Sequence, residues 1–453
     1  MRQYRKTAAA AVLLCLAGFL FAQEAKVSKK QDVAVFALGY YGFNIPQAVL
    51  ANVDAEIQGV FVNLGRFNVL GQTERFSSKD VQDFINLIQT AKQNNTPLPD
   101  EVKFGEVQLT QALMNKLYGA FVVVIPTIVD YRSEYVNNQY EATIKTSVVF
   151  LNVAEGTTMG MANIQTSGAS KDSENQAVGE AINGIPVQLT FEVRKLPAFT
   201  INTQVLQVNF ADIKMQLGSD MGVKVGDEYA VIQQSQLAGL TDEREDGLVL
   251  INNVGPQIST GTILYSGPSL KVGAQLREIP RLGVDIMPYL TYLSYFSPVK
   301  GWTLGTWNDP KETTSTLAAG AKFIVSRGFY DLRPLVGIQM NFDTAMWLPV
   351  IAYGGLEYNL YFRRVALTGS AAIAGASNVL IQILQDQLSK SDNQFFTHYG
   401  VMADLGASYL VSRDMRVFAN VNVQYLFGIA SALGGPFQSY GGYGISGGVL
   451  FKL

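Results

Sequence analysis

The fold of this chain is decided by residues 330–342, which read Tyr-Asp-Leu-Arg-Pro-Leu-Val-Gly-Ile-Gln-Met-Asn-Phe. Every even-numbered residue in this stretch is apolar or aromatic, whereas Asp331, Arg333 and Gln339 lie at odd positions. An alternation of period two predicts a strand with one apolar and one polar face. Eight such segments follow one another in residues 281–453. The pattern predicts an eight-stranded antiparallel transmembrane β-barrel in this region.

The connections between these segments differ in length. Bacterial outer-membrane barrels have short periplasmic turns and longer external loops, so the residues before the barrel are expected in the periplasm. Three tight connections each contain arginine, namely Ser326-Arg327-Gly328, Phe362-Arg363-Arg364 and Ser412-Arg413-Asp414, and three long ones span 294–314, 377–396 and 429–440. In the first long loop, Trp302 and Trp307 are interpreted either as an external contact surface or as interfacial anchors.

Aromatic residues near the segment ends predict girdles at the two membrane interfaces. The outer girdle is expected from Tyr292, Tyr295, Phe342, Trp347, Tyr399 and Phe427, and the inner one from Tyr330, Tyr361, Tyr409 and Phe451. The region resembles the small OmpA/OmpX-type outer-membrane barrels over its whole length. Its last segment, Tyr443 to Leu453, is similar to their terminal insertion signal in its alternation.

An eight-stranded barrel has room inside for side chains and not for an open aqueous channel. The inward-facing charged residues are expected to be Asp285, Lys322, Asp331, Arg333, Glu357, Arg364, Asp404 and Arg416. Four acids and four bases predict a paired network that fills the lumen, because unpaired buried charges are costly. A gated ion path is the alternative interpretation.

Composition excludes several classes of function. The 453 residues are 48% hydrophobic and 16% charged, and they contain one His and one Cys. Average soluble proteins have about 25% charged residues. One His and one Cys cannot form a structural zinc site, and a net charge of −3 argues against a nucleic-acid partner. We therefore expect neither an enzyme nor a metal or cofactor site.

The N-terminus has the pattern of an export signal. Arg2, Arg5 and Lys6 precede an uncharged apolar run that ends at Ala22. The run is shorter than the roughly 20 residues that span a bilayer, so residues 1–22 are predicted to be a signal peptide. Cys15 lies inside this run, and its lipidation is left open.

Residues 32–197 alternate between strand and helix patterns, which predicts an α/β domain. The helix is expected over 46–62, where apolar residues recur at steps of three and four. Four motifs, Val33-Ala34-Val35-Phe36, Gly65-Arg66-Phe67-Asn68-Val69-Leu70, Tyr118-Gly119-Ala120-Phe121 and Glu155-Gly156-Thr157-Thr158, resemble the periplasmic domain of the curli-secretion-channel (CsgG) lipoproteins and the penicillin-binding-protein activators. The resemblance implies a periplasmic partner in envelope assembly, secretion or peptidoglycan synthesis.

Residues 198–279 are predicted to form a small β domain, because short strand patterns are separated by Gly and Asp turns such as Val223-Lys224-Val225-Gly226-Asp227-Glu228. The stretch Thr241 to Gly247 contains four carboxylates. It is interpreted as a solvated hairpin tip, with a cation-binding loop as the alternative.

The leading hypothesis is therefore an outer-membrane barrel that contacts membrane lipid and anchors a two-part periplasmic module for a protein partner. The alternatives are an oligomeric secretion or transport channel and a surface adhesin that acts through loops 294–314 and 377–396.

Overall fold

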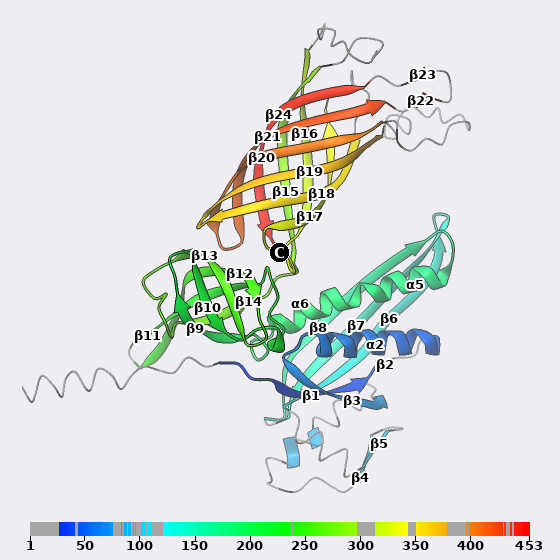
Figure 1. Cartoon of the computed structure of the whole chain (residues 1–453). Helices are drawn as coiled ribbons and strands as arrows, with labels where there is room; N and C mark the ends of the chain where they lie inside the picture. The colour runs from blue at the N-terminus through cyan, green and yellow to red at the C-terminus, as the bar shows by residue number, and fades with distance from the viewer. Residues whose placement is uncertain are drawn as a thin grey trace, which may run out of the picture.

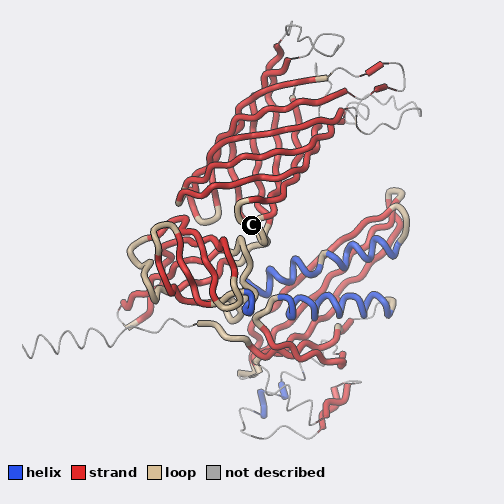
Figure 2. The backbone as a smooth tube through the Cα atoms, viewed as in Figure 1, coloured by secondary structure: helices blue, strands red, loops and turns tan. Residues whose placement is uncertain are grey.

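The structure is a computed structural model in which the described elements are mostly strands. They form a mixed sheet with helices, a small closed barrel and a larger closed barrel (Figure 1), and Figure 2 shows how few of them are helical. The described residues are 27–453 without 41–43, 76–82, 84–85, 88, 92–93, 95, 97–100, 105–106, 111–120, 154, 238, 297–312, 343–349, 378–395, 397, 429, 432–434 and 437–438.

The first part of the chain forms a six-stranded sheet in the order β3-β1-β6-β7-β8, with β2 paired to β6. Strand β1 is parallel to β3 and β6, whereas β7 is antiparallel to both of its neighbours. The strands are β1 (Gln31–Ala37), β2 (Gly39–Tyr40), β3 (Phe67–Arg75), β6 (Val122–Val136), β7 (Gln139–Asn152) and β8 (Thr157–Ser170). A separate hairpin consists of β4 (Glu101–Phe104) and β5 (Val107–Thr110).

Among the elements that the structure describes, the helices α2 (Gln47–Asn63), α5 (Glu174–Asn183) and α6 (Ile185–Lys195) pack on this sheet. Helix α2 buries Leu50, Val53 and Ile57 at helical spacing against the strands, so the helix expected over 46–62 is confirmed. The α/β class predicted for residues 32–197 stays a prediction, because much of 76–120 lies outside the described residues. Among the helices that the structure describes, none has both the length and the apolar character needed to cross a membrane.

The second part is a closed six-stranded barrel in the order β10-β13-β12-β11-β14-β9. We call it the small barrel. Closure leaves no unpaired strand edge, and Ile213, Tyr229, Val231 and Ile251 fill its interior. Its elements are β9 (Asn202–Val208), β10 (Asp212–Gln216), η1 (Ser219–Met221), β11 (Glu228–Leu237), β12 (Leu240–Val254), β13 (Ile258–Ser266) and β14 (Gln275–Ile279).

The third part is a closed antiparallel barrel of eight strands, which confirms the strand number and topology predicted for residues 281–453. We call it the large barrel. First strand β15 pairs with last strand β24 and closes it. Its strands are β15 (Val284–Phe296), β16 (Thr313–Val325), β17 (Leu332–Asn341), β18 (Val350–Phe362), β19 (Val365–Ser377), β20 (His398–Ser412), β21 (Met415–Gly428) and β24 (Tyr440–Lys452), with a short pair β22 (Ala430–Ser431) and β23 (Gly435–Pro436) between the last two.

The two faces of the large-barrel strands follow the sequence alternation. In β17, Leu332 and Val336 are exposed on the outside, whereas Arg333 and Gln339 are buried inside. The same alternation continues along the neighbouring strands, so apolar side chains cover the outer wall. The alternation in residues 330–342 therefore correctly predicts that the outer face of the barrel wall is apolar.

Two residues predicted for the aromatic girdles face the lumen instead. Tyr295 is 2% exposed and its hydroxyl accepts a hydrogen bond from Gln424 Nε2 at 2.7 Å. Tyr361 stacks beside the guanidinium of Arg333 inside the large barrel. Both residues occupy positions whose side chains point into the lumen. This position along the strand outweighs the preference of aromatic side chains for the membrane interface. Trp347 lies outside the described residues.

Substitutions at two glycines, Gly226 and Gly239, test how closely the two barrels approach each other. Gly226 and Gly239 have nearly equal positive φ angles of 83° and 84°. A Cβ at Gly226 would overlap the carbonyl oxygens of Ser326 and Phe329 in the large-barrel turn, whereas a Cβ at Gly239 meets nothing within 4 Å. We expect G226A to destabilise the protein by about 1–3 kcal/mol more than G239A, as measured by thermal unfolding. Equal losses would mean that only backbone strain matters.

Candidate functional site

The three parts of the chain meet at a turn of the small barrel that carries two adjacent acids, Asp227 and Glu228. Asp227 Oδ1 accepts hydrogen bonds from Arg194 Nη2 of helix α6 at 3.0 Å and from Arg327 Nε of the large barrel at 2.8 Å. Its other oxygen accepts from the backbone N–H of Lys224 at 2.8 Å. One carboxylate therefore contacts all three parts of the chain.

Glu278, at the end of the small barrel, extends this contact. Its carboxylate accepts hydrogen bonds from Arg66 Nη1 and Nη2 at 2.7 and 3.0 Å and from Arg194 Nε at 2.8 Å. The backbone N–H of Ile201 donates to it at 3.2 Å. We call Arg66, Glu278, Arg194, Asp227 and Arg327 the junction network. Its first four members are at most 3% exposed, so solvent screens these ion pairs little.

The charged state of Glu278 is stabilised inside this network. Burial alone would raise the pKa of its carboxyl, and the guanidinium groups of Arg66 and Arg194 outweigh that effect, so the pKa lies well below its usual range. For the same reason, burial would lower the pKa of Arg194, and the carboxylates of Glu278 and Asp227 raise it instead. Glu278 and Arg194 are therefore both ionised at neutral pH.

Glu228 forms a second cluster, which we call the seam clasp, with Arg281, Lys452 and Asp414. Arg281 Nη2 and Nε donate to Glu228 Oε2 at 2.9 and 3.1 Å, and Lys452 Nζ donates to Glu228 Oε1. Arg281 Nη1 also donates to Asp414 Oδ1 at 2.6 Å and to the carbonyl of Lys452 at 3.1 Å.

The clasp lies where the first and last strands of the large barrel meet. Arg281 precedes β15 and Lys452 ends β24, and the C-terminus lies at this point in Figure 1. Burial would raise the pKa of Glu228, and Lys452 and Arg281 lower it below its ordinary value. An acid of the small barrel therefore bridges the closing seam of the large one.

All three tight arginine turns contact the small barrel. Arg327 bonds to Asp227, and Arg413 pairs with Glu245. Arg363 Nη2 donates to the carbonyl of Phe210 at 3.2 Å, and the guanidinium of Arg364 lies 4.1 Å from the centre of the Tyr265 ring. The turns that the sequence marked as periplasmic are thus the docking surface for the small barrel.

Apolar side chains fill the space between these charged contacts of the two barrels. One face of the small barrel contributes Leu248, Leu250 and Leu264, which cluster with Leu410 of the large barrel. Tyr330 packs against the cluster, and its hydroxyl lies 2.8 Å from Thr262 Oγ1. The small barrel therefore covers the turn end of the large-barrel lumen.

Inside the lumen, the predicted charged residues divide into paired and unpaired groups. Lys322 pairs with Asp404, which also accepts hydrogen bonds from Ser370 and Asn420. Arg333 Nη1 lies 3.4 Å from Asp285 Oδ2.

Two other lumen residues have no ion pair among the described residues. Glu357 accepts a hydrogen bond from the amide of Asn359 at 2.9 Å. Arg416 donates to Ser408 Oγ at 3.4 Å. The predicted set is therefore only partly paired.

Two members of the predicted lumen set lie elsewhere. Asp331 is exposed before β17 begins, where its carboxylate accepts from the N–H of Leu332. Arg364 lies in a turn against Tyr265. Both residues lie just before the first residue of a strand, so the alternation of that strand does not set their direction. Strand ends are the least certain part of a pattern-based prediction. Trp302 and Trp307, predicted as external contacts, lie outside the described residues.

The acidic stretch Thr241 to Gly247 supplies contacts within the protein. Glu243 pairs with Arg277 at 2.6 Å, Glu245 with Arg413, and Asp246 accepts from the N–H of Ser269 at 3.0 Å. In the part of the chain that the structure describes, no group of three or more His, Cys, Asp or Glu is placed to hold a metal ion.

Comparison with known proteins gives similarities of low score. No family model and no curated protein matches this chain. The solved structure of neisserial surface protein A is 16% identical, with 38% of this chain and 97% of that chain covered and a TM-score of 0.24. The hypothetical protein CT253 from Chlamydia trachomatis is 13% identical, with 37% and 99% covered and a TM-score of 0.25.

A longer but weaker similarity links the chain to OmpT, an outer membrane protein of Vibrio cholerae. It is 9% identical, with 73% of this chain and 95% of that chain covered and a TM-score of 0.15. At these TM-scores the similarities decide nothing about function, and the large barrel is established by its own strand pairing. The resemblance of residues 32–197 to the curli-secretion-channel domain stays a prediction.

The junction network was missed by sequence reasoning. Arg194 and Glu278 stand in stretches of mixed polarity with no motif around them, and the motif Gly65 to Leu70 that contains Arg66 does not indicate its partner. The partners are distant along the chain, since Arg66 and Glu278 are 212 positions apart. The only local signal is a charged residue next to the apolar residues of a strand. This signal does not show which distant residue is the partner.

We expect R194Q to lower the free energy of unfolding of residues 32–279 by about 3–5 kcal/mol, because it leaves two buried carboxylates short of a partner. K195Q is the matched control, since Lys195 is the adjacent residue and its pair with Glu192 is half exposed; a change within about 0.5 kcal/mol is expected there. Urea unfolding of the detergent-solubilised chain measures both. Similar losses for the two variants would contradict the role of the network.

The lowered pKa values of Glu278 and Glu228 predict loss of the junction in acid. A carboxyl whose folded pKa lies below its unfolded value, about 4.3, contributes its full stability above that value. The contribution falls as the pH drops through the lower folded pKa. We expect constant resistance of the junction to proteolysis from pH 7 to about pH 5 and a decline below about pH 4. A steep decline between pH 7 and pH 5 would rule out these carboxylates as the cause.

Proposed function

We propose that this chain is a non-enzymatic outer-membrane protein whose large barrel anchors residues 32–279 in the periplasm as a partner-binding module, with a role in envelope assembly or secretion. The observation that carries this proposal is the small barrel docked on the turn end of the large one. Buried ion pairs and an apolar seal hold the two together. Such a junction fixes the module at one end of the barrel.

The outer wall of the large barrel supports a membrane location. Its exposed residues are apolar and come from many of its strands, which in water would form an unfavourable continuous patch. In a bilayer the same residues face lipid chains. They include Leu290, Leu317, Val336, Ile338, Leu356, Ile373, Val401, Leu405, Val421, Val423 and Ile445.

The position of the module at the turn end of the barrel supports a periplasmic location for it. It docks at the end that carries the three tight turns, whereas Phe296 and Ser377, the last strand residues before two of the longer connections, lie at the other end of the barrel. Outer-membrane barrels place short turns in the periplasm and longer loops outside. The module would then meet periplasmic proteins, as the resemblance of residues 32–197 suggests for its partner class.

The filled lumen favours an anchor over a channel. Within the described residues, two small lumen cavities of about 20 Å³ each are lined by polar and apolar side chains, and each is large enough for a water molecule. The small barrel covers one end. A channel made by this chain would have to run between copies and not through one barrel.

Site-specific photo-cross-linking in intact cells tests the proposed partner. A photoreactive residue at Met161 or Tyr135, which are exposed on the module, is expected to trap a periplasmic protein. The same residue at Leu405, on the lipid-facing wall, is the control and is expected to give no protein adduct. Adducts only from residues in the long loops would overturn the anchor proposal in favour of an adhesin.

Planar-bilayer recording separates the anchor from the channel. We expect the purified full-length protein to be monomeric and to give no stepwise conductance, because the lumen is filled and covered. A stable multimer with defined conductance steps would contradict the anchor proposal and support the oligomeric channel.

A further inference from the structure

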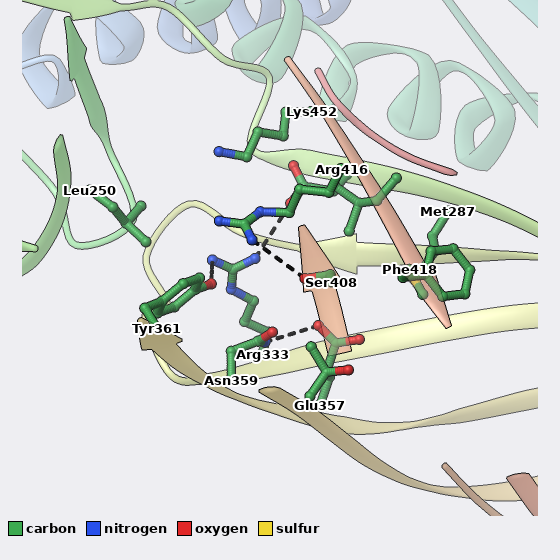
Figure 3. Close-up of a pocket in the computed structure, with 13 residues that line it drawn as sticks. Leu250, Met287, Arg333, Glu357, Asn359, Tyr361, Ser408, Arg416, Phe418 and Lys452 are labelled. Carbon is green, nitrogen blue, oxygen red and sulfur yellow. Dashed lines mark hydrogen bonds and ion pairs between the residues drawn. The ribbon is translucent and has the colours of Figure 1, made fainter. Parts of the chain in front are cut away.

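A small cavity lies in the large-barrel lumen next to the small barrel, whose Leu250 contributes to its lining. Its volume is about 20 Å³, enough for one water molecule or one monatomic ion. Figure 3 shows Arg333, Glu357, Arg416 and Lys452 around it, and Asp285 also contributes to its lining.

Arg416 is the cation of this cavity without a carboxylate partner among the described residues. Its side chain is buried, with the whole residue 4% exposed. Nη1 donates to the carbonyl of Arg364 and to Ser408 Oγ, each at the long distance of 3.4 Å. Nη2 has no hydrogen-bond partner in the described part of the chain. A buried guanidinium N–H without an acceptor is costly.

The other two cations around the cavity are already paired. Arg333 lies near Asp285, and Lys452 donates to Glu228 in the seam clasp. Arg333 and Arg416 lie on the same tyrosine, with their guanidinium carbons 5.7 and 5.5 Å from the centre of the Tyr361 ring. Two guanidinium groups therefore converge here, and among the described residues only Arg333 has a carboxylate partner.

A second unpartnered group lines the same cavity. The hydroxyl of Thr368 is buried and has no hydrogen-bond partner in the described residues, and a hydroxyl can donate to an anion. The remaining acid, Glu357, bonds to Asn359, and both line the cavity. Among the described residues, the unpaired donors of this cavity are thus the two N–H groups of Arg416 Nη2 and the Thr368 hydroxyl, and they lack a negatively charged acceptor.

We infer that this cavity binds one monovalent halide-sized anion, chloride under physiological conditions, held by Arg416 Nη2 and neutralising that guanidinium. The inference does not depend on the proposed anchoring function, because it concerns the lumen alone. A bound ion at this position would stabilise the large barrel at the end that the small barrel covers.

Bromide is the direct probe, because it replaces chloride and scatters X-rays anomalously. In crystals of the full chain grown with bromide in place of chloride, we expect an anomalous peak in the cavity beside Arg416. Density for a water molecule without an anomalous peak would overturn the inference.

Thermal unfolding gives an independent measurement in detergent. At equal ionic strength, potassium chloride is expected to raise the midpoint of unfolding of the large barrel by about 2–4 °C relative to potassium gluconate or sulfate. R416Q is expected to remove this difference. K322Q is the matched control, because Lys322 lines the other lumen cavity, and it is expected to lower the midpoint in all salts while keeping the difference. A chloride effect that survives in R416Q would contradict the site.

Discussion

The structure depends on the burial of Arg194 between two carboxylates. Its guanidinium reaches Glu278 at the end of the small barrel and Asp227 in the turn that contacts the large barrel. Removing ions from water is costly, and the cost is offset only when every group finds its partner. That requirement fixes helix α6, the small barrel and the turn at Arg327 relative to one another, because any displacement leaves a buried charge unpaired.

The seam clasp links the same junction to closure of the large barrel. Glu228 follows Asp227 directly, and its partners Arg281 and Lys452 come from opposite ends of the barrel sequence. They come together only when β15 has paired with β24. Docking of the small barrel and closure of the large barrel therefore stabilise each other. In the folded protein, one turn of the small barrel therefore contacts helix α6 through Asp227 and the closing seam of the large barrel through Glu228.

Sequence alone predicted the large barrel well, because a wall between lipid and a polar lumen imposes alternation on every strand. Leu332, Arg333 and Val336 lie on the predicted faces, and the arginine turns define the docking end. Prediction failed where the period of two does not decide position. Asp331 and Arg364 are such cases, because they lie beyond strand ends. Tyr295 failed for another reason, since it was assigned to the girdle by its aromatic character although the alternation of its strand places it in the lumen. The junction network could not be predicted from the sequence, because its ion pairs join residues that are distant along the chain.

The central claim is that membrane anchor and module form one rigid body. Pulsed electron paramagnetic resonance tests it directly, with spin labels at Met161 on the module and Leu405 on the barrel wall, both exposed, after replacement of Cys15, the only cysteine of the sequence. The account predicts a single narrow distance distribution in lipid that is unchanged by added salt. A broad or multimodal distribution would contradict it.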